Sequence, residues 1–163
     1  EVLCWQKSNF SDLLEDVISE KLDFCQHNTS KSSFGVLRGL HFQTKPKAQT
    51  KLISVSHGEI LDVVLDVRKG SPTYGKHCSV ILNDINNFQL LVPKGFAHGF
   101  ISLSESVRVN YQVDNYYSSE NEFGINPFDN NLKINWILEK NQIIINEKDI
   151  LHKNLSESPA YKF

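Results

Sequence analysis

A series of short segments rich in β-branched and aromatic residues, separated by turns, constrains the fold of this chain most. Two of these segments, residues 51–55 and 59–67, follow one another across a Ser-His-Gly turn. Similar segments lie at residues 77–82, 88–92, 100–103 and 107–113, and shorter extended pieces at 134–137 and 142–145. Short strands that alternate with turns are typical of a β-sandwich or a β-barrel. The sequence therefore predicts a mainly β fold.

The two ends of the chain depart from this pattern. Residues 8–20 predict one N-terminal helix, because their apolar side chains recur at helical spacing and Ser8 or Ser11 could cap the first turn. Residues 148–163 predict a short C-terminal tail with a helical turn. No repeat or linker interrupts the sequence, so we expect a single domain over residues 1–163.

The composition is that of an ordinary globular chain. It has 163 residues, of which 40% are hydrophobic and 22% charged, and a net charge of −2. This charge argues against nucleic acid as a partner, and no apolar run reaches the length of a membrane span. The three cysteines are scattered, which argues against a disulfide framework or structural zinc. With no signal-peptide pattern and no starting Met, we expect a cytoplasmic protein of which this chain is a fragment.

Two segments each place one histidine among glycines and apolar residues. They are residues 35–43, GVLRGLHFQ, with His41, and residues 93–100, PKGFAHGF, with His98. Either histidine alone would be interpreted as a core residue bonded to a backbone carbonyl. Because burying an unpaired ionisable side chain is costly, two of them indicate a polar pocket that does chemistry. Gln43, two residues after His41 in a strand, is expected to point into the same space.

The second segment has the pattern Pro-x-Gly-x-x-His, which resembles the second cupin motif. The β fold is therefore predicted to be a cupin-type jelly-roll barrel. Many cupins hold a metal with a His-x-His pair in their first motif, but here Gln43 stands where the second histidine would be. Glutamine is a poor ligand for transition metals. We predict a site without metal or other cofactor, with a metal-dependent cupin oxygenase or isomerase as the alternative.

Longer segments extend the resemblance over nearly the whole chain, from about residue 9 to 155. Besides the two histidine segments they comprise residues 26–33 (QHNTSKSS), 48–52 (AQTKL), 68–75 (RKGSPTYG) and 147–149 (EKD), together with Tyr111, Tyr116 and Tyr117. Taken together they resemble the dTDP-4-dehydrorhamnose 3,5-epimerase family. The resemblance implies a metal-free cupin that works as a homodimer on a nucleotide-sugar substrate.

The same resemblance implies a reaction. The substrate would be a nucleoside-diphospho-4-keto-6-deoxy sugar, typically dTDP-4-keto-6-deoxyglucose. Its 4-keto group acidifies the protons on C3 and C5, so a base can remove each proton to form an enolate. An acid then returns a proton to the opposite face of the ring. At both carbons, this converts the D-xylo ring into the L-lyxo ring.

Catalytic roles follow from the resemblance residue by residue. His41 matches the base, since imidazole titrates near neutrality, and Asp149 matches the carboxylate that pairs with it. Tyr111 matches the acid on the opposite face. Lys51 matches a lysine near the ketone, where a cation stabilises the developing enolate oxygen. Without the resemblance, Asp149 would be interpreted as a solvated tail residue, Tyr111 as a strand aromatic and Lys51 as a surface lysine.

Six further residues match substrate contacts of the family. Arg38 is suited to hydrogen-bonding anionic or carbonyl oxygens, and Tyr117 matches a tyrosine that stacks on the thymine. The others are Gln26, His98, Glu122 and Lys148.

The chain also departs from the family pattern. It begins after an Asp-x-Arg-Gly segment, so we expect it to lack the first N-terminal strand. Leu3 falls where a glutamate is usual, His27 replaces an aspartate, and residues 124–129 differ from a Trp-Asn-Asp run. These departures leave open a single-site 3- or 5-epimerase of another nucleotide-linked sugar. A non-catalytic carbohydrate-binding cupin is a further alternative.

Overall fold

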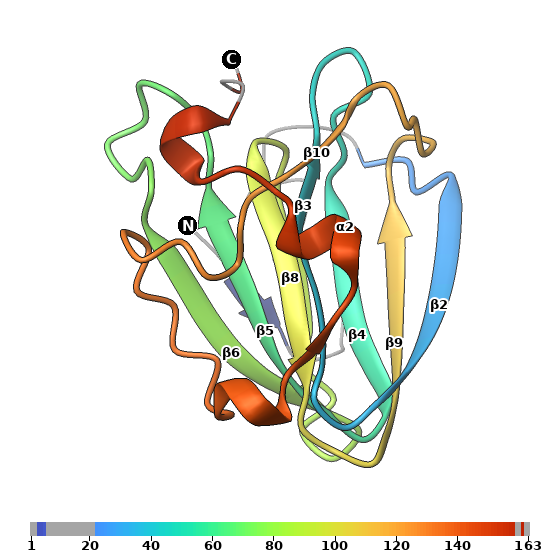
Figure 1. Ribbon diagram of the computed structural model, residues 1–163. Coiled ribbons are helices and arrows are strands. Elements are labelled where there is room, and N and C mark those ends of the chain that lie inside the picture. Colours follow the sequence, from blue (N-terminus) through green and yellow to red (C-terminus); the bar gives the residue numbers. More distant parts are fainter. Residues whose placement is uncertain (1–2, 6–21, 159–160, 162–163) are drawn as a thin grey trace.

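The computed structural model describes residues 3–5, 22–158 and 161, whose strands form two sheets packed face to face (Figure 1). The first sheet is antiparallel and has the order β1-β7-β4-β9-β2. Its strands are β1 (Leu3–Trp5), β7 (Gln89–Val92), β4 (Lys51–His57), β9 (Ser106–Val113) and β2 (Gln26–Ser33).

The second sheet has the order β10-β3-β8-β5-β6, with β11 parallel to β3 beside this path. Its strands are β10 (Glu122–Gly124), β3 (Val36–Gln43), β8 (Phe96–Ser102), β5 (Glu59–Asp66), β6 (His77–Asn83) and β11 (Ile144–Ile145). Between residues 140 and 158 the structure has three short helices: η1 (Lys140–Gln142), α2 (Glu147–Ile150) and η2 (Leu155–Glu157). Nowhere in the part of the chain that the structure describes is there a helix long and apolar enough to cross a membrane.

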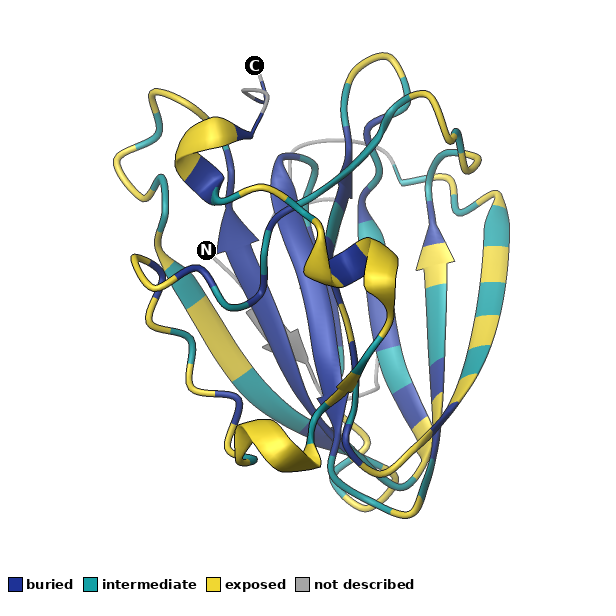
Figure 2. Cartoon of the chain, in the orientation of Figure 1, coloured by how far each residue is buried: buried dark blue, intermediate teal, exposed yellow. Residues whose placement is uncertain are grey.

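Apolar side chains cover both faces of the second sheet. On β5, Ile60 and Val64 pack with the first sheet, while Leu61, Val63 and Leu65 pack outward. The outer cluster is closed by residues from the C-terminal part of the chain: Ile125, Leu132, Trp136, Leu155 and Tyr161. Figure 2 shows the result, since β5 and β8 are buried along almost their whole lengths. Leu155 and Tyr161 belong to the segment expected to be a tail, so part of that segment packs on this sheet.

The predicted mainly β jelly roll is confirmed, with shifts at the ends of some strands. β8 begins at Phe96, four residues before the predicted segment, because the chain turns at Gly95, where φ is +86°. The extended piece at 134–137 pairs with no strand that the structure describes, and only Ile144 and Ile145 of the later piece do so. The helix expected at residues 8–20 lies outside the described residues.

β2 is a strand that apolar patterning could not indicate. Its sequence, QHNTSKSS, is polar throughout, and it lies at the edge of the first sheet. Alternate side chains are exposed, as the stripes in Figure 2 show. The other face lines a polar cavity rather than an apolar core, so neither face needs apolar side chains.

Candidate active site

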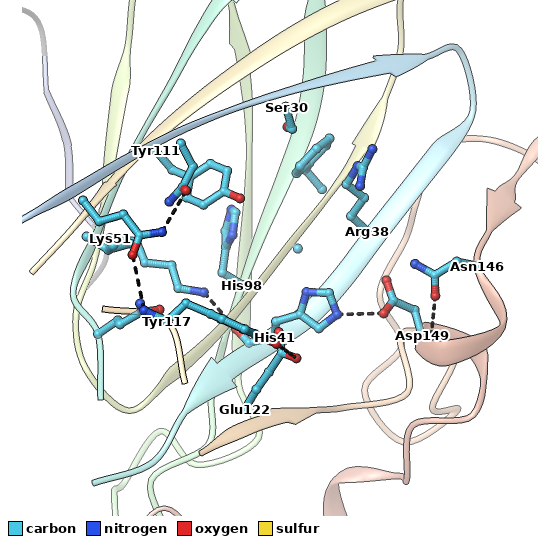
Figure 3. Close-up of a pocket in the computed structure, with 16 residues that line it drawn as sticks. Ser30, Arg38, His41, Lys51, His98, Tyr111, Tyr117, Glu122, Asn146 and Asp149 are labelled. Atoms are coloured by element: carbon cyan, nitrogen blue, oxygen red, sulfur yellow. Dashed lines mark hydrogen bonds and ion pairs between the residues drawn. The ribbon is translucent and has the colours of Figure 1, made fainter. Parts of the chain in front are cut away.

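A cavity of about 450 Å³ opens between the two sheets, and polar side chains from both of them line it (Figure 3). Nine of the ten predicted site residues lie in its wall: Gln26, Arg38, His41, Lys51, His98, Tyr111, Tyr117, Glu122 and Asp149. The tenth, Lys148, contacts Glu122 at the rim. The fold therefore gathers into one cavity residues that lie up to 123 positions apart in the sequence (26 to 149).

His41 and Asp149 form a hydrogen-bonded pair although 108 positions separate them. The Nε2 atom of His41 lies 2.7 Å from Oδ1 of Asp149, and the Asp149 side chain is 1% exposed. The second carboxylate oxygen accepts the backbone N–H of Gly39 at 3.0 Å. Asn146 caps α2 by accepting the N–H of Asp149 at 2.7 Å, which fixes the residue that carries the carboxylate.

These hydrogen bonds decide the charge of Asp149. Burial alone would raise its pKa, but the hydrogen bonds to His41 and to the Gly39 N–H outweigh burial, so the pKa lies below its ordinary value. An ionised carboxylate accepts a hydrogen bond from the Nε2–H of His41, which leaves the lone pair of the neutral ring on Nδ1. The pair can therefore present a basic nitrogen to the cavity.

A local irregularity in β3 makes this contact possible. The register with β8 shifts between Arg38 and His41, and Gly39 lies there with φ at +113°. A Cβ on Gly39 would lie 2.6 Å from the Cα of Gly99. Only glycine fits so close to β8 in this backbone conformation, and it turns its N–H toward Asp149.

Tyr111 faces the cavity from the other sheet. It belongs to β9, whereas His41 belongs to β3. Burial raises the pKa of the Tyr111 phenol, although the positive charge of Arg38 opposes the rise and Glu122 adds to it. The phenol therefore keeps its proton at neutral pH and can act as a donor across the cavity from the imidazole.

Lys51 lies between these groups on β4. Its Nζ donates to the backbone carbonyl of His41 at 3.3 Å. Burial lowers its pKa to about 8, against the opposing charges of Glu122 and Asp62. The ammonium form still dominates at pH 7, so the cavity holds a poorly hydrated cation that can attract a developing oxyanion.

His98 has a buried carboxylate partner that the sequence analysis missed. Its Nε2 atom lies 2.8 Å from Oδ2 of Asp62, which is 0% exposed. Burial raises the pKa of Asp62, against the opposing effects of His98 and Lys51. The signal was present, since an aspartate interrupts the apolar run EILDVVLD of β5, and a buried acid needs a partner.

The rim of the cavity is a chain of hydrogen bonds. Tyr117 Oη donates to Glu122 at 3.1 Å, and Lys148 pairs with the same carboxylate. The hydrogen bonds to Glu122 raise the pKa of both Tyr117 and Lys148. Burial would raise the pKa of Glu122, but the bonds from Lys148 and Tyr117 outweigh it and lower the pKa. Gln26 joins this group by accepting the backbone N–H of Tyr117 at 3.3 Å.

Arg38 lines the wall beside the edge strand β2. Its Nε donates to Ser32 Oγ at 3.1 Å. Six further lining residues were not predicted from the sequence: Asn28, Ser30, Gln49, Phe100, Val113 and Asn146. On β2 a period of two starting at Gln26 would have found Asn28 and Ser30, because alternate residues share a face.

Gln43 does not line the cavity as expected. Its side chain accepts the backbone N–H of Ser118 at 2.8 Å and donates to the carbonyls of Lys47 and Tyr116. It therefore holds the segment that carries Tyr117, and the prediction that it faces the same space as His41 was wrong.

A third histidine also reaches the Asp149 pair. His152 Nε2 lies 3.4 Å from Asp149 Oδ1, and its ring packs edge-on against His41 with centroids 5.5 Å apart. His152 was not predicted as a site residue, because nothing in the sequence of the C-terminal segment indicates which of its side chains return to the cavity.

Comparisons with known proteins agree with this geometry. The sequence model of the dTDP-4-dehydrorhamnose 3,5-epimerase family matches residues 2–157. The chain belongs to this family. The dTDP-4-dehydrorhamnose 3,5-epimerase of Shigella flexneri is 44% identical over 85% of this chain and 75% of its own length. That of Methanothermobacter thermautotrophicus is 42% identical over 99% of this chain and 89% of its own.

A solved structure has the same fold. The dTDP-6-deoxy-D-glucose-3,5-epimerase from Legionella pneumophila, in complex with dTDP-4-keto-L-rhamnose, superposes with a TM-score of 0.89 at 39% identity. The match covers 96% of this chain and 84% of the other. Of the departures from the family pattern, His27 is exposed on β2 and is not part of the cavity wall.

Proposed function

We propose that this protein epimerises C3 and C5 of dTDP-4-dehydro-6-deoxy-D-glucose and so forms dTDP-4-dehydro-L-rhamnose. Membership of the family supports this isomerase activity. The observation that carries the proposal is the placement of the His41–Asp149 pair and Tyr111 on opposite sheets around one cavity. A substrate ring held between the sheets would have a base on one face and an acid on the other.

His41 starts the reaction in this proposal. Its Nδ1 atom removes the proton from C3 or C5, which the neighbouring ketone has acidified. Asp149 fixes the ring by its hydrogen bond to Nε2 and stabilises the imidazolium that forms. Proton removal leaves an enolate whose negative charge lies on the 4-oxygen.

Lys51 and His98 stabilise this enolate. Lys51 supplies a positive charge in a site where burial keeps water away, which makes the charge more effective than it would be in solution. His98, held by Asp62, offers a second hydrogen bond from the adjacent strand β8. Tyr111 then donates its phenolic proton to the opposite face of the same carbon, and the configuration is inverted.

The nucleotide part of the substrate is proposed to lie along β2 and the rim. Arg38 is suited to the diphosphate, because its guanidinium can donate two hydrogen bonds to phosphate oxygens. Tyr117 offers an aromatic face to the thymine. The side chain of Gln26 lies against Tyr117 and contacts the same region, and Glu122 and Lys148 set the position of the Tyr117 hydroxyl.

The homodimer, the cytoplasmic location and the extent of the domain are proposals that accompany this function. The exposed edge strand β2 supports self-association, since an edge strand has free hydrogen-bonding groups. Light scattering on the purified chain would measure the oligomeric state. A monomer with full activity would contradict the dimer but not the reaction.

The test of the function is proton NMR of dTDP-4-keto-6-deoxyglucose incubated with the protein in D₂O. We expect deuterium to enter at both C3 and C5 and the L-lyxo product to form. Exchange at one carbon alone would favour a single-site epimerase. Binding without exchange at either carbon would overturn the proposal in favour of a carbohydrate-binding cupin.

A further inference from the structure

The cluster of His41, Asp149 and His152 contains more potential ligand atoms than proton transfer requires. One ligand atom from each residue lies within 4.8 Å of the other two. Asp149 Oδ1 lies 2.7 Å from His41 Nε2 and 3.4 Å from His152 Nε2. The His152 nitrogen is buried and makes no hydrogen bond to any residue that the structure describes. A buried polar atom of this kind needs an explanation.

Two imidazoles and one carboxylate are a donor set that suits zinc. Bonds of about 2.0–2.2 Å to a tetrahedral ion place the ligand atoms roughly 3.3 Å from one another. The distance between His152 and Asp149 already agrees with this value. The shorter distance between His41 and Asp149 must widen by about half an ångström, and the partly exposed His41 side chain has room on its cavity side.

The surroundings hold these groups in place without a metal. The N–H of Gly39 fixes the second oxygen of Asp149, so the first oxygen remains directed at the two rings. Gly124 leaves space for His152, because a Cβ at residue 124 would overlap the His152 ring. The carboxylate and the third ligand are thus oriented by backbone contacts.

We propose that His41, Asp149 and His152 form a Zn²⁺ site whose occupation reversibly inhibits the enzyme. Zinc on Nε2 of His41 would displace the hydrogen bond to Asp149, and the neutral ring would then carry its proton on Nδ1. In that tautomer Nδ1 has no lone pair for the substrate. The bound ion therefore removes the base, and the catalytic cycle itself uses no metal.

The binding part of this proposal stands on the geometry alone, and the inhibition part rests on the proposed function. The experiment measures both on chelator-treated, full-length protein. Co²⁺ absorption and calorimetry with Zn²⁺ report binding, and the epimerase rate with and without Zn²⁺ reports inhibition. We expect one tetrahedral Co²⁺ spectrum per chain, displacement by Zn²⁺, and loss of activity that EDTA restores. Mg²⁺, which prefers six oxygen ligands, should not inhibit.

The deciding variant is His152→Gln, with His57→Gln as its control. His57 is exposed and lies 3.8 Å from Asp84, so it represents an ordinary surface histidine near a carboxylate. Loss of a ligand in His152→Gln should weaken Zn²⁺ binding by more than the roughly 10–100-fold that loss of an outer-shell partner costs. The Zn²⁺ concentration that inhibits should rise by the same factor. Each rate is taken relative to the same variant without metal. His57→Gln should behave as the parent does.

Equal Zn²⁺ affinity in the parent and in His152→Gln would overturn the site. Zn²⁺ bound with full turnover would overturn the inhibition. If neither form turns over the sugar, the proposed function fails while the binding data still decide the site. Near-ultraviolet circular dichroism verifies the folding of His152→Gln, and His152→Asn provides a second substitution if it is misfolded.

Discussion

Two histidine–aspartate pairs lie on neighbouring strands of one sheet, and their surroundings differ. His41 and His98 are directly paired in the register of β3 and β8. The partner of His41, Asp149, also accepts a backbone N–H, and its pKa lies below the ordinary value. The partner of His98, Asp62, has one oxygen without a hydrogen bond among the residues that the structure describes, and its pKa is raised.

The contrast teaches that a backbone hydrogen bond helps to distinguish the two pairs. Both carboxylates are buried, at 1% and 0% exposure. One N–H from a glycine in a strand irregularity supplies the extra hydrogen bond that keeps Asp149 ionised. An ionised partner suits a base that must become positively charged, whereas a partner that resists ionisation suits a histidine that only donates a hydrogen bond.

The largest effect is expected from His41→Asn. It removes the base and should lower turnover by at least the roughly 10²–10⁴-fold typical of a general acid or base. Deuterium entry from D₂O, followed by NMR, should vanish at both carbons. His98→Asn is the matched change in the other pair, and it should slow the reaction while exchange stays measurable. Loss of exchange in His98→Asn with its retention in His41→Asn would reverse the assignment.

Tyr111→Phe should separate the two halves of the reaction. The acid acts after the base, so this variant should lose product formation more than ~10²-fold while exchange at the substrate carbons continues. Steady-state product analysis and deuterium incorporation measured on one sample provide the comparison. If exchange disappears together with turnover, Tyr111 does more than return the proton.

The pH dependence tests the third participant, Lys51. Its ammonium form is needed and its pKa is about 8, so kcat should fall as the pH rises through that value. Lys51→Arg keeps a positive charge at all accessible pH values. This variant should be slower, by about tenfold or more, yet lack the alkaline limb near pH 8. Persistence of that limb would assign it to another group.

The smallest effect is expected on the pH dependence of folding stability. It has opposite signs for the carboxylates of Asp149 and Asp62. The folded-state pKa of Asp149 lies below 3.8, so its stabilising contribution is present above that pH and is lost as the pH falls through the folded value. The folded-state pKa of Asp62 lies above 3.8, so ionising it costs stability as the pH rises from there.

Melting temperatures of Asp149→Asn and Asp62→Asn between pH 3 and 7 measure this difference. Relative to the parent, Asp149→Asn should lose most stability near neutrality and least in acid. Asp62→Asn should show the opposite trend, by a few degrees in each case. If the melting temperatures of both variants changed with pH in the same way, the proposed difference in ionisation between Asp149 and Asp62 would be wrong.

The sequence predicted the parts of this molecule that depend on local pattern. Apolar strands such as β5 and β9 were predicted from their β-branched residues, and the ten site residues came from motif resemblance. β2 was missed because a strand between solvent and a polar cavity has no apolar face. Asp62 was missed because its role depends on its contact with His98 on the neighbouring strand β8. The sequence does not show which strands are neighbours in the sheet.

The C-terminal part was the hardest to predict. Asp149 follows no regular pattern with His41, and the contact depends on β11 lying parallel to β3 and on the cap from Asn146. The positions of His152 and Gln43 were not predicted for the same reason, because their contacts also depend on segments that are distant in the sequence. Spacing within a strand fixes a side chain's face, but a neighbouring loop decides whether that face reaches the cavity.

The edge position of β2 has a consequence for how this enzyme could change over evolution. Three of its side chains, Gln26, Asn28 and Ser30, contribute to the cavity, and none belongs to the apolar clusters. Substitutions there can alter the preferred sugar nucleotide with little risk of unfolding, since they leave no hole in the interior. Tyr111 on β9, the proposed acid, packs against the apolar cluster between the sheets and has less freedom. New substrates can therefore arise on this scaffold while its chemistry is preserved.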